Sequence, residues 1–260
     1  MKRPLFSLVY TDENIVAVNK SSGVAVSPDR WEPSLERLDK LVEDSLNAAN
    51  AGSGQDASQN QKLFTVHRID RDTSGLVVFA KNSEAHKTLS MAFEHRQVKK
   101  RYIAAVSGRP SWNETSCDLP LVPNGNKQHL TIIDKYRGKK SLTTFRLLGS
   151  TGNYSIVEAF PETGRTHQIR VHLAALGHSV VQDRLYGNTK PVLLSAIKRG
   201  WRGDLFEEQS LISRLGLHAA EIFIPDYKSK EGLRIAAPLY KDMAALVKQM
   251  EKAAGREFGV

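Results

Sequence analysis

Apolar and polar residues along the first part of the chain follow both a strand period and a helix period. Short β-rich runs at 6–10 and 15–19 flank a polar segment at 11–14, which predicts a hairpin with a four-residue loop. After Ser34, a suitable N-cap residue, apolar side chains recur at helical spacing and predict a helix of about three turns. These positions are Leu35, Leu38, Leu41, Val42 and Leu46.

Residues 48–62 interrupt this pattern. They contain Ala, Asn, Gly, Ser, Gln and Asp but no bulky apolar side chain, so they bury too little surface to offset the entropy of ordering. We predict a mobile surface loop here. Beyond it, an apolar run at 76–80 predicts a buried strand, and Ser83 is placed to cap a helix with Ala85 and Leu89 on one face.

The remainder of the chain is richer in strands. Runs at 102–106, 130–133, 142–148, 154–160 and 217–224 are joined by mostly short Gly-, Asn- and Pro-containing connections, which favours antiparallel pairing. Helices are predicted over 165–176, which ends at Gly177, and after Pro238. The predicted class is therefore α+β: a mixed, largely antiparallel sheet flanked by helices.

Composition limits the classes of protein to consider. The 260 residues fit one domain, 1–260, and the net charge of +9 makes a polyanion a suitable partner. Cys117 is the only cysteine, which excludes an intramolecular disulfide and a cysteine-rich zinc site. No stretch resembles a signal peptide or a membrane span. We expect a cytoplasmic monomer that does not bind a membrane.

The densest chemistry lies at 67–75, His-Arg-Ile-Asp-Arg-Asp-Thr-Ser-Gly, directly before the apolar run. Thr73, Ser74 and Gly75 by themselves are typical of a turn. Arg68 and Asp70 need another explanation, because charges this close to buried strands require partners, and flanking guanidiniums stabilise a carboxylate. We interpret this segment as a site.

The same nine residues resemble the H-R-L-D-x-x-T-S-G signature of the RluA-type pseudouridine synthases, with Ile69 in the Leu position. Residues 164–172, Gly-Arg-Thr-His-Gln-Ile-Arg-Val-His, are similar to a second family motif, G-R-[ST]-H-Q-[IL]-R-V-H. Lys100-Arg101-Tyr102 matches K-x-Y, and 217–219 matches a fourth motif. Four motifs in the family's order make the resemblance specific.

The resemblance implies a single catalytic domain with a central active-site cleft, and an isomerase that converts specific uridines in structured RNA to pseudouridine without a cofactor or a metal. Asp70 would be the nucleophile, attacking either ribose C1′ or the uracil ring, with Arg170 as its charge partner. Tyr102 would stack on the uracil or pass a proton, and Arg68 would fill the gap left by the flipped base. Further RNA contacts are assigned to His67, Lys100, Arg101, Lys139, Arg165 and His167.

Several alternatives accompany this interpretation. From spacing alone, Arg170 would extend its head group to solvent. The spacing of His67, His167 and His172 lacks the i, i+4 pair of a helical zinc site and favours hydrogen-bonded structural histidines. A non-catalytic RNA-binding or RNA-chaperone module would use the same basic cleft without a nucleophile. Because the first strand begins near Phe6, we expect no N-terminal RNA-binding module and favour a transfer RNA stem–loop over ribosomal RNA.

Overall fold

The computed structural model describes residues 4–28, 36–52, 61–128, 130–204 and 206–260. The chain divides into two compact units, Met1–Lys99 with Ala219–Pro238, and Lys100–His218 with Leu239–Val260. We call these unit 1 and unit 2 and describe each by itself. The α+β class is confirmed, because each unit combines helices with antiparallel strand pairs. The single domain over 1–260 and its central cleft stay predictions.

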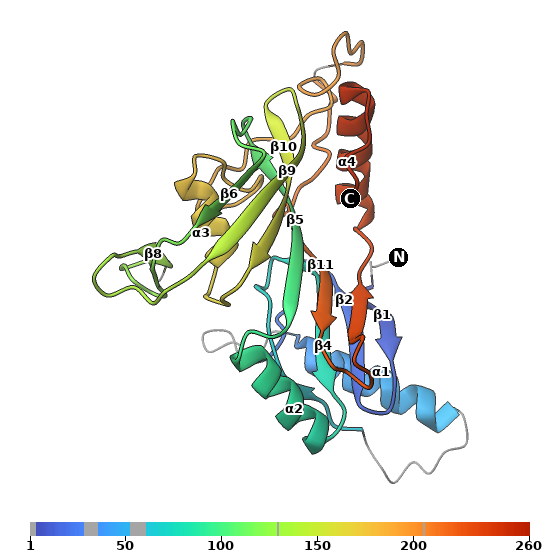
Figure 1. Cartoon of the computed structure of the whole chain (residues 1–260). Coiled ribbons are helices and arrows are strands. Elements are labelled where there is room, and N and C mark those ends of the chain that lie inside the picture. The colour runs from blue at the N-terminus through green and yellow to red at the C-terminus, as the bar shows by residue number, and fades with distance from the viewer. Residues whose placement is uncertain (1–3, 29–35, 53–60, 129, 205) are drawn as a thin grey trace. The chain divides into compact units, whose positions relative to one another are not determined.

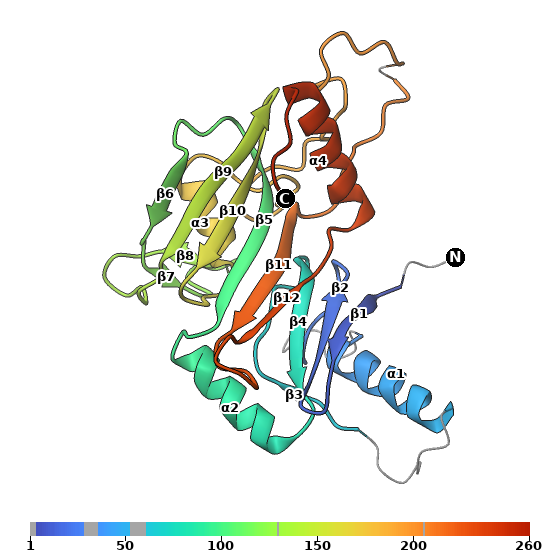
Figure 2. The same cartoon turned by 45° about the vertical axis from the view of Figure 1, so that its right-hand side comes forward.

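Unit 1 is built on β-strands that neighbour one another in the order β1-β2-β4-β11, with β3 paired to β4 and β12 paired to β11. The pairs β1–β2, β2–β4, β3–β4 and β11–β12 are antiparallel. Figure 2 shows β11 and β12 side by side. The elements are β1 (Phe6–Thr11), β2 (Ile15–Lys20), α1 (Leu38–Gly52), β3 (Phe64–Thr65), β4 (Ser74–Ala80), α2 (Ser83–Glu94), β11 (Leu217–Ile224, which begins in unit 2) and β12 (Leu233–Ala236).

The predicted elements of unit 1 form, with shifted boundaries. The β1–β2 hairpin has a three-residue loop, 12–14, because Thr11 pairs with Val16. Helix α2 is capped by Asn82 and not by Ser83: the Asn82 side chain accepts a 2.9 Å hydrogen bond from the Ala85 amide. Ser74 and Gly75 belong to strand β4 and not to a turn. Apolar side chains of α2, β2, β4, β11 and β12 form one core.

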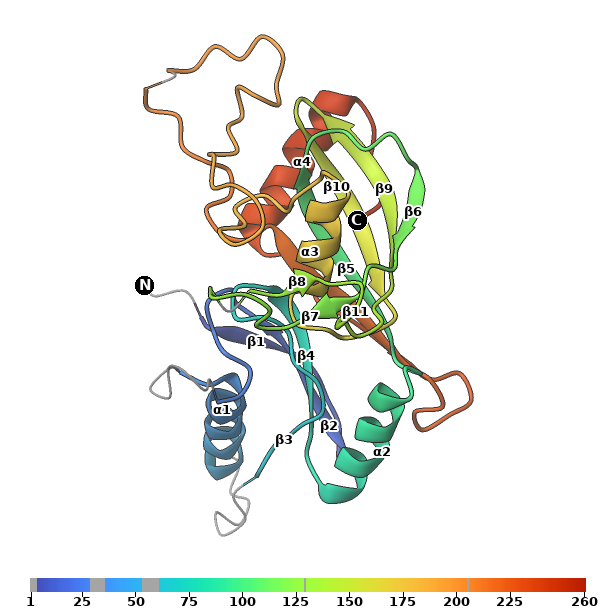
Figure 3. The same ribbon diagram turned by 90° about the vertical axis from the view of Figure 1, so that its left-hand side faces the viewer.

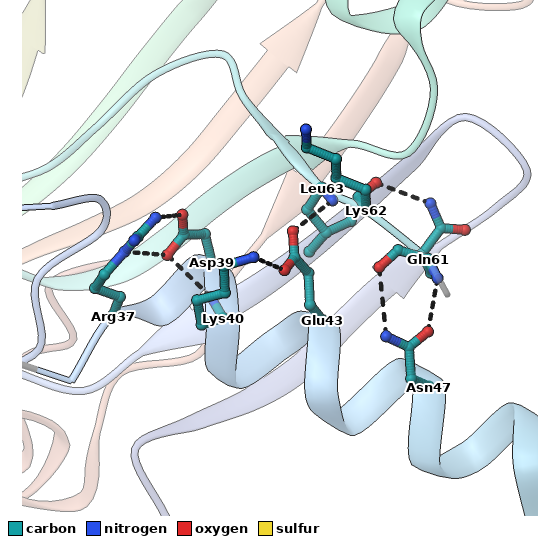
Figure 4. Close-up of polar contacts among 8 residues, drawn as sticks. All are labelled: Arg37, Asp39, Lys40, Glu43, Asn47, Gln61, Lys62 and Leu63. Carbon is teal, nitrogen blue, oxygen red and sulfur yellow. Dashed lines mark hydrogen bonds and ion pairs between the residues drawn. The ribbon is translucent and has the colours of Figure 1, made fainter. Parts of the chain in front are cut away.

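The prediction of a loop over 48–62 is wrong at both of the ends that the structure describes, 48–52 and 61–62. Helix α1 continues through residue 52, since alanine is the best helix former and the segment is Ala-rich. Residues 61–63 are then held against this helix (Figure 4): Asn47 Oδ1 accepts from the Gln61 amide at 2.7 Å, and Glu43 Oε1 accepts from the Leu63 amide at 2.8 Å. Residues 53–60, and Ser34 and Leu35 of the predicted helix, lie outside the described residues.

Unit 2 contains a second antiparallel arrangement, β5-β10-β9-β6, and a small β7–β8 pair. Its helices α3 and α4 lie on opposite faces of these strands (Figures 1 and 3). Alternate strand residues meet α3, so Ala104, Phe145 and Val157 pack with Ile169 and Leu173. The elements are β5 (Lys99–Ser107), β6 (Glu114–Cys117), β7 (Leu121–Val122), β8 (Ile132–Ile133), β9 (Thr143–Thr151), β10 (Tyr154–Pro161), α3 (Gln168–Ala175) and α4 (Lys241–Ala254).

Two boundaries in unit 2 matter for the site. The charged run at 99–101 lies inside β5 and not before it. Helix α3 begins at Gln168, three residues later than predicted, and Gly177 follows it with φ +81°. Arg165 and His167 therefore lie in the loop ahead of the helix, where their side chains are not constrained by helical spacing.

Gly75 provides a test of this packing. Its φ is +114°, and a Cβ added there would lie 2.3 Å from the Ala219 carbonyl oxygen. Because both strain and overlap oppose a side chain, we expect Gly75→Ala to lower the free energy of unfolding by about 3 kcal/mol or more. Gly23→Ala is the control: φ is +93° but nothing lies within 4 Å. Equal losses of unfolding free energy for the two variants, measured by urea denaturation, would contradict the close approach of Gly75 to Ala219.

Candidate active site

The Asp70 loop of unit 1 is held through its backbone. The Thr73 amide donates to the Asp70 carbonyl at 3.1 Å, which closes a tight turn. The next carbonyl, that of Arg71, accepts from the Gly23 amide at 2.8 Å and from Lys20 Nζ at 2.8 Å. The Asp70 side chain is half-buried, and hydrogen bonds to the carbonyls of Asp70 and Arg71 fix the backbone that carries it.

Lys20 is the residue that sequence reasoning missed. Its side chain is fully buried, and besides the Arg71 carbonyl its ammonium donates to the carbonyls of Ser21 at 3.0 Å and Val24 at 2.9 Å. A buried ammonium is costly unless it is hydrogen-bonded, and three carbonyls match its three protons. The available signal was a lysine at the end of an apolar strand.

His67 and Arg68 have different environments. The His67 ring stacks on Phe93, with centroids 4.7 Å apart, and its Nε2 accepts a 2.9 Å hydrogen bond from the Val78 amide. Because an amide donates to Nε2, that nitrogen carries no proton. His67 thus fastens its segment to β4, while Arg68 is exposed.

The K-x-Y segment of unit 2 lies in β5, where alternate side chains face opposite sides. Lys100 and Tyr102 therefore share one face, and Tyr102 packs against the core that contains α3 residues. Arg101 faces the other side and pairs with the buried Glu158, which also pairs with Arg146. Two guanidiniums on one carboxylate leave this second face cationic.

Arg170 is buried, with 3% of its surface exposed, so the interpretation that it extends to solvent is wrong. Its Nε and Nη2 donate to the two Asp183 oxygens, each at 2.8 Å. The Leu185 and Tyr186 amides donate to the same carboxylate at 2.9 and 3.1 Å. Burial alone would raise the pKa of Asp183, but the hydrogen bonds and charge of Arg170 outweigh it and hold that pKa below its ordinary value.

Tyr186 connects this pair to the loop ahead of α3. Its ring lies 5.2 Å from the Arg170 guanidinium carbon, and its hydroxyl is 2.8 Å from His167 Nδ1. The same hydroxyl accepts from the Thr131 amide at 2.9 Å. Arg165 Nε donates to the Lys140 carbonyl at 3.2 Å, next to the exposed Lys139. Unit 2 thus brings Arg165 and His167, in the loop ahead of α3, close to the 131–140 segment that carries Lys139.

His172 is the structural histidine that the spacing indicated. It is fully buried, and its ring nitrogens lie 3.0 Å from Thr143 Oγ1 and 3.0 Å from the Leu119 carbonyl. Burial lowers its pKa, so the ring is neutral near pH 7. Among the described residues, no group of three or more His, Cys, Asp or Glu side chains is placed to hold a metal ion. In the same residues, no helix is long and apolar enough to cross a membrane.

Comparison with known proteins identifies the family of the chain. The profile of the RNA pseudouridylate synthase family matches residues 14–175, which include the Asp70 loop, β5 and α3. Ribosomal large subunit pseudouridine synthase D of Zymomonas mobilis is 34% identical over 246 residues, covering 94% of this chain and 72% of that protein. The chain belongs to the RluA-type RNA pseudouridine synthases. It is therefore an RNA-modifying isomerase.

The similarity to other relatives of this pseudouridine synthase covers most of this chain and most of each relative. The dual-specificity RNA pseudouridine synthase RluA of Vibrio vulnificus is 30% identical over 251 residues, covering 94% of this chain and 88% of the relative. Human RNA pseudouridylate synthase domain containing 4 shares the fold, with a TM-score of 0.68 at 20% identity over 94% of this chain and 92% of that one.

The Arg170–Asp183 pair of the synthase provides a stability test. Asp183→Asn keeps one oxygen but loses the carboxylate, and we expect it to lower the unfolding free energy by roughly 3–5 kcal/mol. Asp242→Asn is the control, since Arg214 and Asp242 form a bidentate pair with the same geometry but with side chains 16% and 15% exposed. A loss for Asp183→Asn no larger than that of the control would contradict the importance of burial.

The stabilising effect of Asp183 should also depend on pH. Since folding depresses the pKa of Asp183 below 3.8, its contribution is complete above that value and disappears as the pH falls through the folded pKa. The stability difference between wild type and Asp183→Asn should therefore narrow below about pH 4. Urea unfolding between pH 7 and pH 3, in roughly unit steps, measures this. A constant difference over that range would be inconsistent with an ionised Asp183.

Proposed function

We propose that this protein isomerises specific uridines of structured RNA through nucleophilic attack by Asp70 on a flipped uridine. The reaction breaks the glycosidic C–N bond, rotates the base and makes a C–C bond, so it needs a nucleophile but no redox partner. A carboxylate suits this step because it is both nucleophilic and able to leave. The attacked atom is ribose C1′ or an atom of the uracil ring.

The observation that carries the proposal is the backbone hydrogen bonding around Asp70. Lys20 and Gly23 fix the Arg71 carbonyl, Ser22 Oγ donates to the Asp72 carbonyl at 2.7 Å, and Thr73 closes the turn. A loop fixed at three successive carbonyls keeps its side chain near one position, which is what a nucleophile requires. A non-catalytic RNA-binding module would have no need for it.

The remaining roles follow the family resemblance and the arrangement within each unit. Arg170, oriented by Asp183, serves as the charge partner of Asp70, and Tyr102 stacks on the uracil or transfers a proton. Arg68 is exposed, as a side chain that replaces a flipped base in RNA must be. Lys100, Lys139 and Arg165 contribute positive charge toward phosphates. His67 and His167 act by positioning their loops.

Asp70→Asn tests the nucleophile. The amide has the same shape but cannot attack, so pseudouridine formation should fall by at least about a thousandfold while RNA affinity stays within a few-fold of wild type. Asp72→Asn is the matched control, since Asp72 is exposed and lies in the same loop. Turnover by pure Asp70→Asn near the wild-type rate would overturn the assignment and favour the non-catalytic alternative.

We further propose that the target uridine lies in a compact stem–loop, with transfer RNA favoured over assembled ribosomes. Unstacking a base costs a few kcal/mol and costs least in a loop. The relatives include synthases named for the ribosomal large subunit and for dual specificity. Purified protein should be offered free transfer RNA, a free ribosomal RNA fragment and intact subunits at one salt concentration, and modified sites mapped. Activity confined to intact subunits would contradict this preference.

A further inference from the structure

Tyr136 is the most exposed tyrosine side chain that the structure describes. It lies between β8 and β9 and leaves 99% of its surface in solvent. An aromatic ring presented in this way gains nothing from burial in the fold, so packing does not explain its place. Both of its flat faces are open to a ligand.

The turn that carries Tyr136 is well fixed. Asp134 Oδ1 accepts from the Tyr136 and Arg137 amides, each at 2.9 Å, and its Oδ2 accepts from Arg137 Nε at 2.7 Å. The Asp134 carbonyl accepts from the Gly138 amide at 2.8 Å. These bonds hold the pKa of the Asp134 carboxyl below its ordinary value. The ring is thus mounted on a preorganised backbone, which lowers the entropy cost of binding.

Both ends of this turn are anchored to one buried residue. Leu121 pairs with Ile133 before the turn and exchanges two backbone hydrogen bonds, of 3.0 and 2.9 Å, with Lys139 after it. The wider segment contacts residues on both sides of α3: the Lys140 carbonyl accepts from Arg165, ahead of the helix, and the Thr131 amide donates to Tyr186, whose ring lies against Arg170 of α3. Figure 1 shows the β8 excursion extending from unit 2 below α3. The ring is therefore connected to the element that holds Arg170.

The sequence neighbours of the ring are mostly cationic. Lys135 and Arg137 adjoin Tyr136, Lys139 and Lys140 follow, all four are exposed, and Asp134 is the one carboxylate between residues 130 and 142. An aromatic face among such charges suits a nucleic acid base whose neighbouring phosphates meet the cations. This charge pattern favours a polyanion over an apolar protein surface.

We propose that Tyr136 is a stacking platform for one unpaired base of the RNA substrate, outside the catalytic residues. This inference rests on the proposed action on RNA. It assigns the 134–140 turn to binding single-stranded RNA, with stacking by Tyr136 and phosphate contacts by the flanking cations. Duplex RNA, whose bases are already stacked, gains nothing from the ring.

The chain contains a matched control for this platform. Phe206 is 100% exposed, and its amide donates to Asp204 Oδ1 at 2.8 Å, just as the Tyr136 amide donates to Asp134. The charges around it are opposite, because Asp204, Glu207 and Glu208 lie within two residues of it. Phe206 therefore has the exposure and the turn contact of Tyr136, but its nearest charged neighbours are carboxylates in place of cations.

The test measures the affinity of the full chain for labelled oligouridylate and for an RNA duplex of equal length by fluorescence anisotropy. Tyr136→Ala should weaken oligouridylate binding by about tenfold without changing the slope against salt concentration. Tyr136→Phe keeps the ring and should bind like wild type. Phe206→Ala should also bind like wild type, and none of the three should alter duplex affinity.

Unchanged oligouridylate affinity of Tyr136→Ala would overturn the platform, as would an equal loss on duplex RNA or an equal loss for Phe206→Ala. Because these are binding measurements, they are separate from the proposed reaction. If wild type forms no pseudouridine but Tyr136→Ala still weakens binding, the proposed function fails and the platform stands. If wild type is active and Tyr136→Ala binds normally, only the platform fails.

Discussion

The buried ammonium of Lys20 is the interaction on which the arrangement of unit 1 depends. Three carbonyl oxygens, from Ser21, Val24 and Arg71, surround it, and they belong to segments about fifty residues apart in the chain. Losing any of these acceptors would remove a hydrogen bond from a buried ammonium, which is costly. The lysine therefore couples the end of β2 to the Asp70 loop, so that the strand cannot be packed without placing the loop.

Unit 2 uses the same physical principle with the charges reversed. Asp183 is fully buried and is satisfied by the Arg170 guanidinium and by two amides of its own turn. Each unit thus fixes one predicted functional residue by satisfying a buried charge. Buried pairs of this kind add less to net stability than to specificity, because their desolvation cost offsets much of the attraction. Their importance here is that they leave few alternative arrangements for Asp70 and Arg170.

Side-chain contacts and exposure also distinguish the polar residues that are held within the fold from those that are open to solvent. His67, His172 and Arg101 are tied to a backbone amide, to neighbouring oxygens and to Glu158, respectively. Arg68, Lys139 and Tyr136 lie exposed. Sequence motifs list members of both groups together, because a motif records which residues a site requires and not whether each is internal or external. The set of motif residues that are exposed is therefore smaller than the motifs by themselves suggest.

The sequence by itself determined the α+β class, the strands at 76–80 and 154–160, the last helix and the motifs that carry the family resemblance. These depend on local periodicity and on residue types that chemistry requires. Only the tertiary structure decided that Arg170 is buried, that Lys20 fixes the loop that carries Asp70 and that Asp183 fixes Arg170. Their partners lie 13 to 51 residues away, and no local pattern encodes which buried charges will meet.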